Sequence, residues 1–149
     1  MSSGSVDVSG ERIASIERGL VVLVGVGADD RPEDAERLAH KVAGLRVFDD
    51  DRGRLSRSAS DVGGAVLAVP NFTLYGDIRD GRRPDLTKAA PPEKGQRLFD
   101  AFCGAVRAAG VPVETGRFGA LMRVTIKADG PVTIVATTDR WEEGELARG

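Results

Sequence analysis

The sequence predicts a single α+β domain with about seven strands and two main helices. Short runs of apolar and β-branched residues, separated by Gly, Pro or Asp, are typical of strands. Two longer segments instead repeat apolar residues every three or four positions and begin at proline, as amphipathic helices do. A chain of 149 residues is long enough to bury one sizeable core.

Three strand-like runs come first. Val6 to Val8 and Arg12 to Ile16 flank a Ser9-Gly10 turn and should form two short strands. Gly19 to Val26 is continuously apolar and rich in β-branched residues. Because such runs are typical of strands that are covered on both sides, we expect a buried central strand here.

The first helix is predicted to begin at Pro32, where a first helical residue would stand. Asp29 and Asp30, just upstream, are candidate capping residues. Its apolar face has helical spacing and consists of Ala35, Leu38, Ala39, Val42 and Leu45. After the helix, Arg46 to Phe48 has the pattern of a short strand, which should end in the turn residues Asp49 to Gly53.

The middle of the chain is predicted to hold one strand and the second helix. Ala65 to Val69 is a short apolar strand that Pro70 should end, and Asp77 to Pro84 is a charged loop. Pro91-Pro92 opens the helix, and Gly110 is its stop signal. The apolar face of this helix consists of Leu98, Phe99, Phe102, Cys103 and Val106.

Three closing strands are expected over Val111–Glu114, Leu121–Lys127 and Val132–Thr137. The domain would then span residues 1–138, followed by a polar tail over residues 139–149 that we expect to be frayed.

The composition is that of a soluble globular protein, with 41% apolar and 30% charged residues. A net charge of −2 argues against a general nucleic-acid coat but leaves room for a local basic patch. The N-terminus has no signal-peptide pattern, so cytoplasm is the expected compartment. With one His and one Cys, zinc sites of the His/Cys type are excluded.

Two short segments are the most informative for function: Pro70 to Asp77 and Ala128 to Thr133. Each follows a predicted strand, and each contains Gly or Pro, the residues that fix unusual backbone geometry. Neither contains a strong acid–base set or a metal-ligand set. An enzyme built on them would therefore use backbone groups, one hydroxyl and the substrate itself.

These and several other segments resemble those of the D-aminoacyl-tRNA deacylases, and their shared order and spacing make the resemblance specific. It extends from Gly4 to Thr137. The segments that carry it are Gly19–Val26, Leu45–Phe48, Val62–Gly64, Phe72–Asp77, Gly81–Pro84, Thr115–Ala120 and Gly130–Thr133.

The resemblance implies a homodimeric cytoplasmic hydrolase that needs no metal and no organic cofactor. Such an enzyme cleaves the ester that joins a D-amino acid, or glycine mischarged on tRNA-Ala, to the 3′-terminal adenosine of tRNA. The family resemblance also implies that Asn71, Phe72 and Thr73 line the site. A cis Gly130-Pro131 bond would enter the site of the neighbouring subunit and exclude L side chains.

The chemistry can be reasoned from the same residues. Ester hydrolysis passes through a tetrahedral oxyanion, and the backbone N–H groups around Phe72 and Thr73 are natural donors for it. No His or Lys is placed in the sequence to activate Thr73 as a nucleophile, since the lone His40 is on the first helix. We therefore favour attack by water, assisted by the 2′-hydroxyl of the tRNA, with Thr73 positioning the substrate. The alternative is that Thr73 only bonds to the backbone at a strand end.

Contacts to tRNA are expected on a basic loop. Arg82, Arg83 and Lys88 could bind acceptor-stem phosphates, or they could be a solvated loop face. Phe118 could stack on the terminal adenosine or fill the core. Asp129-Gly130 between two strand-like runs would, taken alone, also be typical of an ordinary hairpin turn.

The chain departs from the family pattern at three places. An N-terminal strand ending in Gln-Arg-Val is not seen, Pro70-Asn71 replaces Ser-Gln, and Ala128 replaces Asn. Pro70 removes a backbone donor, and Asn71 keeps the amide on a shorter side chain. Two other functions therefore stay open: a tRNA-binding dimer without catalysis, and a hydrolase of another small ester or amide.

Overall fold

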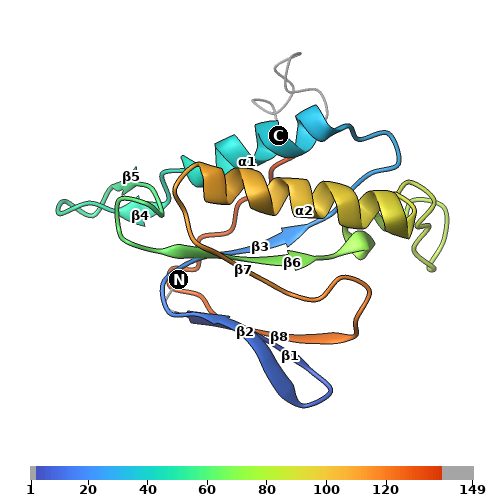
Figure 1. Cartoon of the computed structure of the whole chain (residues 1–149), viewed down its shortest axis with the longest axis horizontal. Coiled ribbons are helices and arrows are strands. Elements are labelled where there is room, and N and C mark those ends of the chain that lie inside the picture. The colour runs from blue at the N-terminus through green and yellow to red at the C-terminus, as the bar shows by residue number, and fades with distance from the viewer. Residues whose placement is uncertain (1–2, 139–149) are drawn as a thin grey trace.

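The computed structural model describes residues 3–138 and has three layers (Figure 1). Two α-helices cover one face of a parallel sheet, and an antiparallel sheet lies against the other face. The mixed α+β class predicted from the sequence is confirmed.

The antiparallel sheet is formed by the two ends of the described chain. Its strands are β1 (Ser3–Val8), β2 (Glu11–Ile16) and β8 (Met122–Lys127), in the order β2-β1-β8. Ser9 and Gly10 join β1 to β2 with φ angles of 52° and 79°. Positive φ at both turn residues suits the twist of a two-residue hairpin, so the predicted turn is confirmed.

The parallel sheet has the order β3-β6-β7 and consists of β3 (Gly19–Val24), β6 (Ala65–Pro70) and β7 (Val113–Thr115). The prediction of a buried central strand over Gly19 to Val26 is wrong: β3 is an edge strand, and 43% of Leu23 is exposed. The centre is β6, where no residue from Val66 to Val69 exceeds 3% exposure. Hydrophobic periodicity does not decide which of two apolar strands is flanked on both edges.

The helices are α1 (Pro32–Ala43) and α2 (Pro92–Ala108). The predicted apolar face of α2 is confirmed, because all five of its residues are buried. The predicted caps of α1 are wrong. Arg31 is the N-cap residue, its N–H donates to the Asp34 carboxylate at 2.8 Å, and Asp30 instead accepts from the Gly27 N–H. An acidic residue inside the first turn replaces the upstream cap.

The remaining elements are short. The predicted strand over Arg46 to Phe48 is shifted to β4 (Phe48–Asp49), which pairs with β5 (Leu55–Arg57). Asp50 organises their hairpin by accepting from the Arg52 and Arg54 N–H groups and the Ser56 hydroxyl. A 3₁₀ helix, η1 (Phe72–Tyr75), follows β6 and was not predicted.

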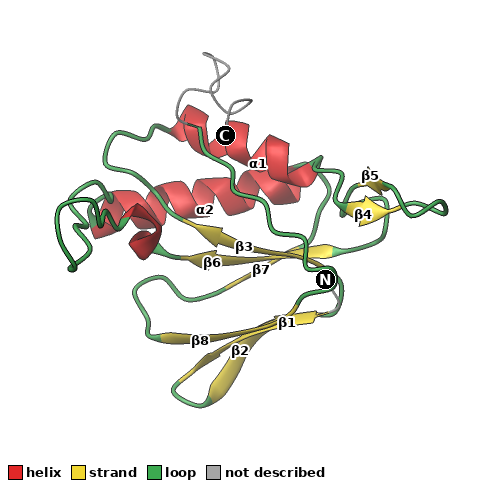
Figure 2. Cartoon of the chain, turned by 180° about the vertical axis from the view of Figure 1, so that it is seen from behind, coloured by secondary structure: helices red, strands yellow, loops and turns green. Residues whose placement is uncertain are grey.

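The third predicted closing strand, Val132–Thr137, is not a strand in the structure. It follows β8 and crosses the parallel sheet toward α1, on the side that faces the viewer in Figure 2. A strand needs a neighbouring edge to pair with, and among residues 3–138 no strand pairs with this segment. The predicted frayed tail lies outside the described residues.

Candidate functional site

The segment Asn71 to Tyr75 lies at the carboxyl end of the central strand. The Asn71 N–H donates to the Val24 carbonyl at 2.8 Å, so the start of η1 is tied to the end of β3. Pro70 is tolerated because successive N–H groups of a strand point to opposite sides. Its missing donor faces the β7 side, where pairing with β6 already ends at Ala68 and Thr115.

The Thr73 side chain is exposed and its hydroxyl donates to Asn71 Oδ1 at 2.5 Å. An amide oxygen accepts a hydrogen bond but does not remove a proton at neutral pH. Among residues 3–138, no His, Lys or carboxylate is hydrogen-bonded to this hydroxyl. The geometry therefore favours a positioning role for Thr73 over a nucleophilic one.

Two backbone donors at the start of η1 are free. Within residues 3–138, neither the Phe72 N–H nor the Thr73 N–H has a hydrogen-bond acceptor, whereas the N–H groups of Leu74 and Gly76 bond to Asn71 and Thr73 carbonyls. Unpaired N–H groups are expected in the first turn of a helix. They are the kind of donor that stabilises an oxyanion.

Two glycines after β3 let η1 approach closely. A Cβ on Gly27 would lie 2.6 Å from the Tyr75 hydroxyl oxygen, and one on Gly25 would lie 3.1 Å from the Leu74 Cβ. A side chain at either position would require Tyr75 or Leu74 to shift, whereas glycine leaves both in place. The glycines in the Gly19 to Val26 motif and after it therefore position the site segment.

The loop that follows η1 is closed by its own polar groups. Asp77 and Asp85 exchange two backbone hydrogen bonds, of 2.9 and 2.8 Å. The Asp77 carboxylate binds the Arg79 guanidinium at 2.6 Å and lies 3.8 Å from the Lys88 ammonium. The hydrogen bonds from Arg79 hold the pKa of Asp77 well below its usual range.

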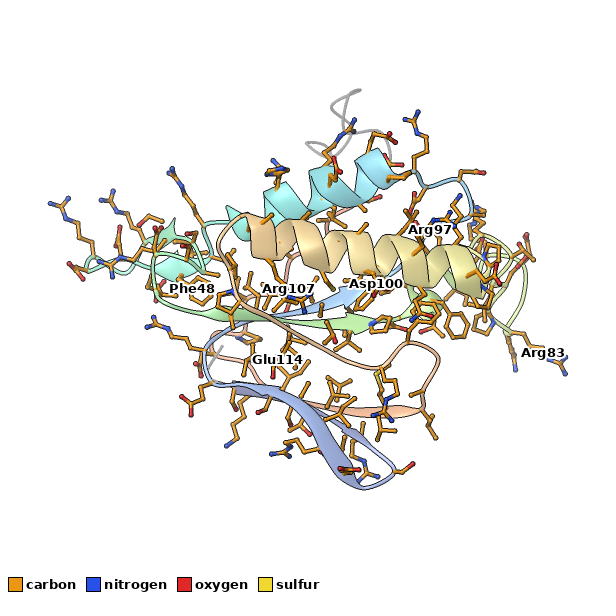
Figure 3. The ribbon with its side chains drawn as sticks, viewed as in Figure 1. Phe48, Arg83, Arg97, Asp100, Arg107 and Glu114 are labelled. Atoms are coloured by element: carbon orange, nitrogen blue, oxygen red, sulfur yellow. The ribbon has the colours of Figure 1, made fainter. Side chains whose placement is uncertain are left out.

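The tip of this loop presents two arginines. Arg82 and Arg83 are exposed, and neither forms an ion pair with another residue of the described chain. Figure 3 shows Arg83 extending from this end of the molecule into solvent. Lys88, by contrast, is partly engaged by Asp77, so the three basic residues predicted to bind tRNA differ in availability.

Phe118 is half-buried against the start of α2, where its ring lies 3.0 Å from an ideal Cβ on Gly95. It packs against the core cluster between the helices and the parallel sheet. Phe118 is therefore part of the core or of a pocket wall. That it stacks on the terminal adenosine stays a prediction.

The Gly130–Pro131 peptide is cis, and Gly130 has a φ of 115°. This pair is far from Thr73 in the same chain. Met122, at the start of β8, and Pro70 both lie next to Gly116, whereas Lys127 at the other end pairs with Ser3. A strand of this length spans about 17 Å, and Figure 1 shows its two ends at opposite sides of the molecule.

Tyr75 also borders a cavity of about 70 Å³ between the end of β3, α1 and Ala136–Thr138. That volume holds only a few water molecules. Neither Phe72 nor Thr73 lines it. This cavity of the single chain is therefore not an enclosed pocket around the free donors.

Other reactive groups are placed away from η1. Cys103 is buried in α2, and burial raises the pKa of its thiol to about 11, which makes it unreactive. His40 is exposed on α1. Within residues 3–138, no three His, Cys, Asp or Glu side chains are grouped as metal ligands would be. No helix in this range is long and apolar enough to cross a membrane.

Comparison with known proteins identifies close relatives. A family model described as D-Tyr-tRNA(Tyr) deacylase matches residues 1–137. A D-aminoacyl-tRNA deacylase of Koribacter versatilis is 52% identical over 135 residues, which cover 91% of each chain. The protein of the same name from Thermomicrobium roseum is 53% identical over 146 residues, covering 98% of this chain and 95% of the relative.

Two solved structures share the fold. One, titled c-Myc DNA Unwinding Element Binding Protein, has a TM-score of 0.84 and 38% identity, and the match covers 89% of this chain and 91% of that one. The other, described as a probable eukaryotic D-amino acid tRNA deacylase, has a TM-score of 0.72 and 17% identity over 88% of this chain and 91% of that one. At that identity the second match supports the fold alone.

The loop after η1 gives a testable acid titration. Because the folded pKa of Asp77 is below its unfolded value, the Asp77–Arg79 pair contributes stability above the unfolded pKa, and this contribution is lost as the pH falls through the folded pKa. Arg79→Ala should raise the pKa of Asp77 toward the ordinary value of about 3.9, as measured by carbon NMR titration of the carboxyl group. Arg82→Ala is the matched control and should leave it unchanged. An ordinary Asp77 pKa in the unmodified chain would contradict the loop geometry.

Proposed function

The chain belongs to the D-Tyr-tRNA(Tyr) deacylase family, and from this membership we propose that it is a D-aminoacyl-tRNA deacylase. It would hydrolyse the ester between a D-amino acid and the 3′-terminal adenosine of tRNA. The family match across residues 1–137 is the observation that carries the proposal. The free donors at Phe72 and Thr73 supply a local reason why this chain could catalyse the reaction.

We propose that water attacks the ester carbonyl carbon and that the 2′-hydroxyl of the tRNA assists it. The carbonyl oxygen becomes an oxyanion, which the Phe72 and Thr73 N–H groups stabilise. When the intermediate collapses, the bond to the 3′ oxygen breaks and that oxygen takes up a proton. The products are the free D-amino acid and the tRNA, and no step uses a metal or an organic cofactor.

The Gly130–Pro131 pair would select the D form from the neighbouring subunit. Its carbonyl groups can accept hydrogen bonds from the substrate ammonium, while its backbone blocks the position of an L side chain. The separation of this pair from Thr73 within one chain supports a site shared between two copies. Glycyl-tRNA would also be accepted, because glycine has no side chain for the wall to exclude.

Exposed apolar residues support a homodimer. They lie on the edge strand β3, on β8 and in the segment after β8: Leu23, Ile126, Val132, Ile134 and Val135, with exposures from 43% to 90%. Apolar side chains left in water are typical of surfaces that bind another protein. We propose that a second copy covers them and brings its own Gly130–Pro131 to η1.

The two arginines at the loop tip would contact the phosphates of the acceptor stem. Arg82 and Arg83 have no carboxylate partner in the described chain, so they can neutralise phosphates without breaking an ion pair. Lys88 would have to leave Asp77 and is the weaker candidate. Because its substrate is charged tRNA, we place the enzyme in the cytoplasm.

The first test is a deacylation time course on D-Tyr-tRNA and L-Tyr-tRNA, with Gly130→Ala as the variant. We expect rapid release of the D amino acid alone, and loss of this release in Gly130→Ala, because a methyl group would crowd the wall at a φ of 115°. Binding of charged tRNA without release would instead identify a binding protein. Tyrosine ethyl ester hydrolysis without any activity on charged tRNA would identify a different esterase.

A mixing experiment tests whether the site is shared. A Thr73→Val subunit and a Gly130→Ala subunit should each be slow as pure dimers. In a mixed dimer one site is intact only if the two motifs come from different subunits. Random remixing makes half of the dimers mixed, with one intact site in two, so activity should return to about a quarter of the unmodified level. No recovery, despite mixed dimers seen by native mass spectrometry, would place both motifs in one subunit.

Salt dependence tests the loop tip. Replacing Arg82 and Arg83 with Ala should lower the slope of log Kd against log salt by up to about 2, since each phosphate contact contributes about 0.9. The matched control replaces Arg52 and Arg54 with Ala. This change removes the same number of positive charges at the β4–β5 hairpin, on the other side of the molecule. An equal change in both double variants would show a general charge effect rather than a contact.

A further inference from the structure

The antiparallel sheet is the outermost layer of the described chain, on the side away from the helices (Figure 1). Val6, Ala14 and Val124 point from its strands into the core between the two sheets. Successive residues of a strand point to opposite faces, so the residues between these core positions point outward. They form the outer sheet face: Ser3, Ser5 and Asp7 of β1, Arg12 and Ser15 of β2, and Arg123, Thr125 and Lys127 of β8.

The outer sheet face consists of three cations, four hydroxyls and one carboxylate, and it has no apolar side chain. Surfaces that bind another protein have apolar and aromatic residues at their centre, whereas Arg, Lys, Ser and Thr are the side chains that contact phosphates. We propose that this face binds the phosphate backbone of the tRNA, outside the part that enters the candidate site. The inference rests on the proposed deacylase function, which makes tRNA the partner.

The single carboxylate does not neutralise the face. Asp7 accepts a hydrogen bond from Arg12 Nε at 3.2 Å, and its side chain is 24% exposed against 59% for Arg12. Arg123 is opposite Asp7 in the strand register but forms no ion pair with any of residues 3–138. Glu17, just past the end of β2, is at the edge away from β8. The face therefore presents net positive charge, strongest along β8, on a chain whose net charge is −2.

Three hydroxyl side chains form a row across the sheet. Ser15, Ser5 and Thr125 are paired in register from β2 through β1 to β8. Ser5, on the middle strand, is only 7% exposed, whereas the other two are exposed. Thr125 stands between Arg123 and Lys127 on the same side of β8, about 7 Å from each along the strand. A phosphate above Thr125 could therefore accept a hydrogen bond from its hydroxyl and lie between two positive charges.

The outer sheet face begins beside the candidate site. Met122 at the start of β8 and Pro70 at the end of β6 both lie next to Gly116, and η1 follows Pro70 directly. Arg123 is therefore the end of the face nearest the site. Lys127 is four residues further along β8, or about 13 Å. A tRNA whose 3′ end is bound at η1 would meet Arg123 first and could continue over the face toward Lys127.

Salt-dependent binding of uncharged tRNA-Tyr tests the face, because this probe binds without being hydrolysed. Replacing Arg123 and Lys127 with Gln should weaken binding and lower the slope of log Kd against log salt by up to about 2, since each phosphate contact contributes about 0.9. On D-Tyr-tRNA the same variant should raise KM and leave kcat unchanged, because neither residue contacts the reacting ester. The matched control replaces Arg52 and Arg54 with Gln at the β4–β5 hairpin, outside this face.

Asp7→Asn tests the face in the opposite direction. The change removes its only carboxylate at nearly constant shape and releases Arg12 from its ion pair. We therefore expect this variant to bind the tRNA more tightly than the unmodified chain and to show a steeper salt dependence. A loss of folding could weaken binding but would not strengthen it. Circular dichroism and size-exclusion chromatography of each variant check fold and assembly.

The outcomes separate this proposal from the deacylase function. Weaker binding by the Arg123 and Lys127 variant, together with tighter binding by Asp7→Asn, supports the face. An unchanged salt slope, or a decrease equal to that of the hairpin control, would overturn it and leave the deacylase function standing. Loss of binding to phosphatidylserine vesicles alone, with tRNA binding unaffected, would also overturn it. If the unmodified chain binds tRNA through this face but releases no D-tyrosine, the deacylase function alone is overturned.

Discussion

Burial of the central strand β6 is the constraint on which the rest of the structure depends. Its side chains alternate between two cores: Val66 and Ala68 pack under the helices, while Leu67 and Val69 pack against the antiparallel sheet. Both layers are therefore fixed to one strand whose edges are already paired. The strand ends at Pro70, and the site segment begins at the next residue, so the position of η1 is set by the best-packed part of the molecule.

The chemical groups of the candidate site are those that the end of the central strand holds in place. Two unpaired backbone N–H groups and one hydroxyl are available at η1, and a backbone donor needs no particular side chain to point correctly. Electrostatic stabilisation by fixed dipoles is among the largest contributions to ester hydrolysis. No acid or base is directed at Thr73 within the described chain. In the proposed reaction the substrate hydroxyl next to the ester would therefore assist the attacking water.

A site shared between two copies would link activity to assembly. The Gly130–Pro131 pair lies beyond β8, and η1 lies beyond β6, at opposite sides of one chain. Exposed apolar residues lie on β3, on β8 and in the segment after β8. Dimerisation would cover this surface and complete the site in one step. A monomer would therefore lack the chiral wall and would leave these apolar side chains exposed to water.

Much of this could be predicted from sequence because it depends on local chemistry. The apolar spacing from Leu98 to Val106 fixed which face of α2 is buried, and the segments shared with the deacylases identified the family. Positive φ at the Ser9-Gly10 turn follows from residues that tolerate it. These properties need only the periodicity of one element or the identity of adjacent residues.

Tertiary structure alone decided the properties that depend on neighbours distant in the sequence. The pattern of Gly19 to Val26 is the same whether its strand is central or at an edge. In the sheet, β3 pairs with β6 on one side and with no strand of the described chain on the other, which makes it an edge strand. Val132 to Thr137 has the composition of a strand, but a strand must pair with a neighbour, and this segment pairs with no strand of the described chain. The Asn71–Thr73 hydrogen bond likewise depends on the 3₁₀ turn η1. Hydrophobic periodicity could not predict this turn, because the ends of two parallel strands, β3 and β6, hold it in place.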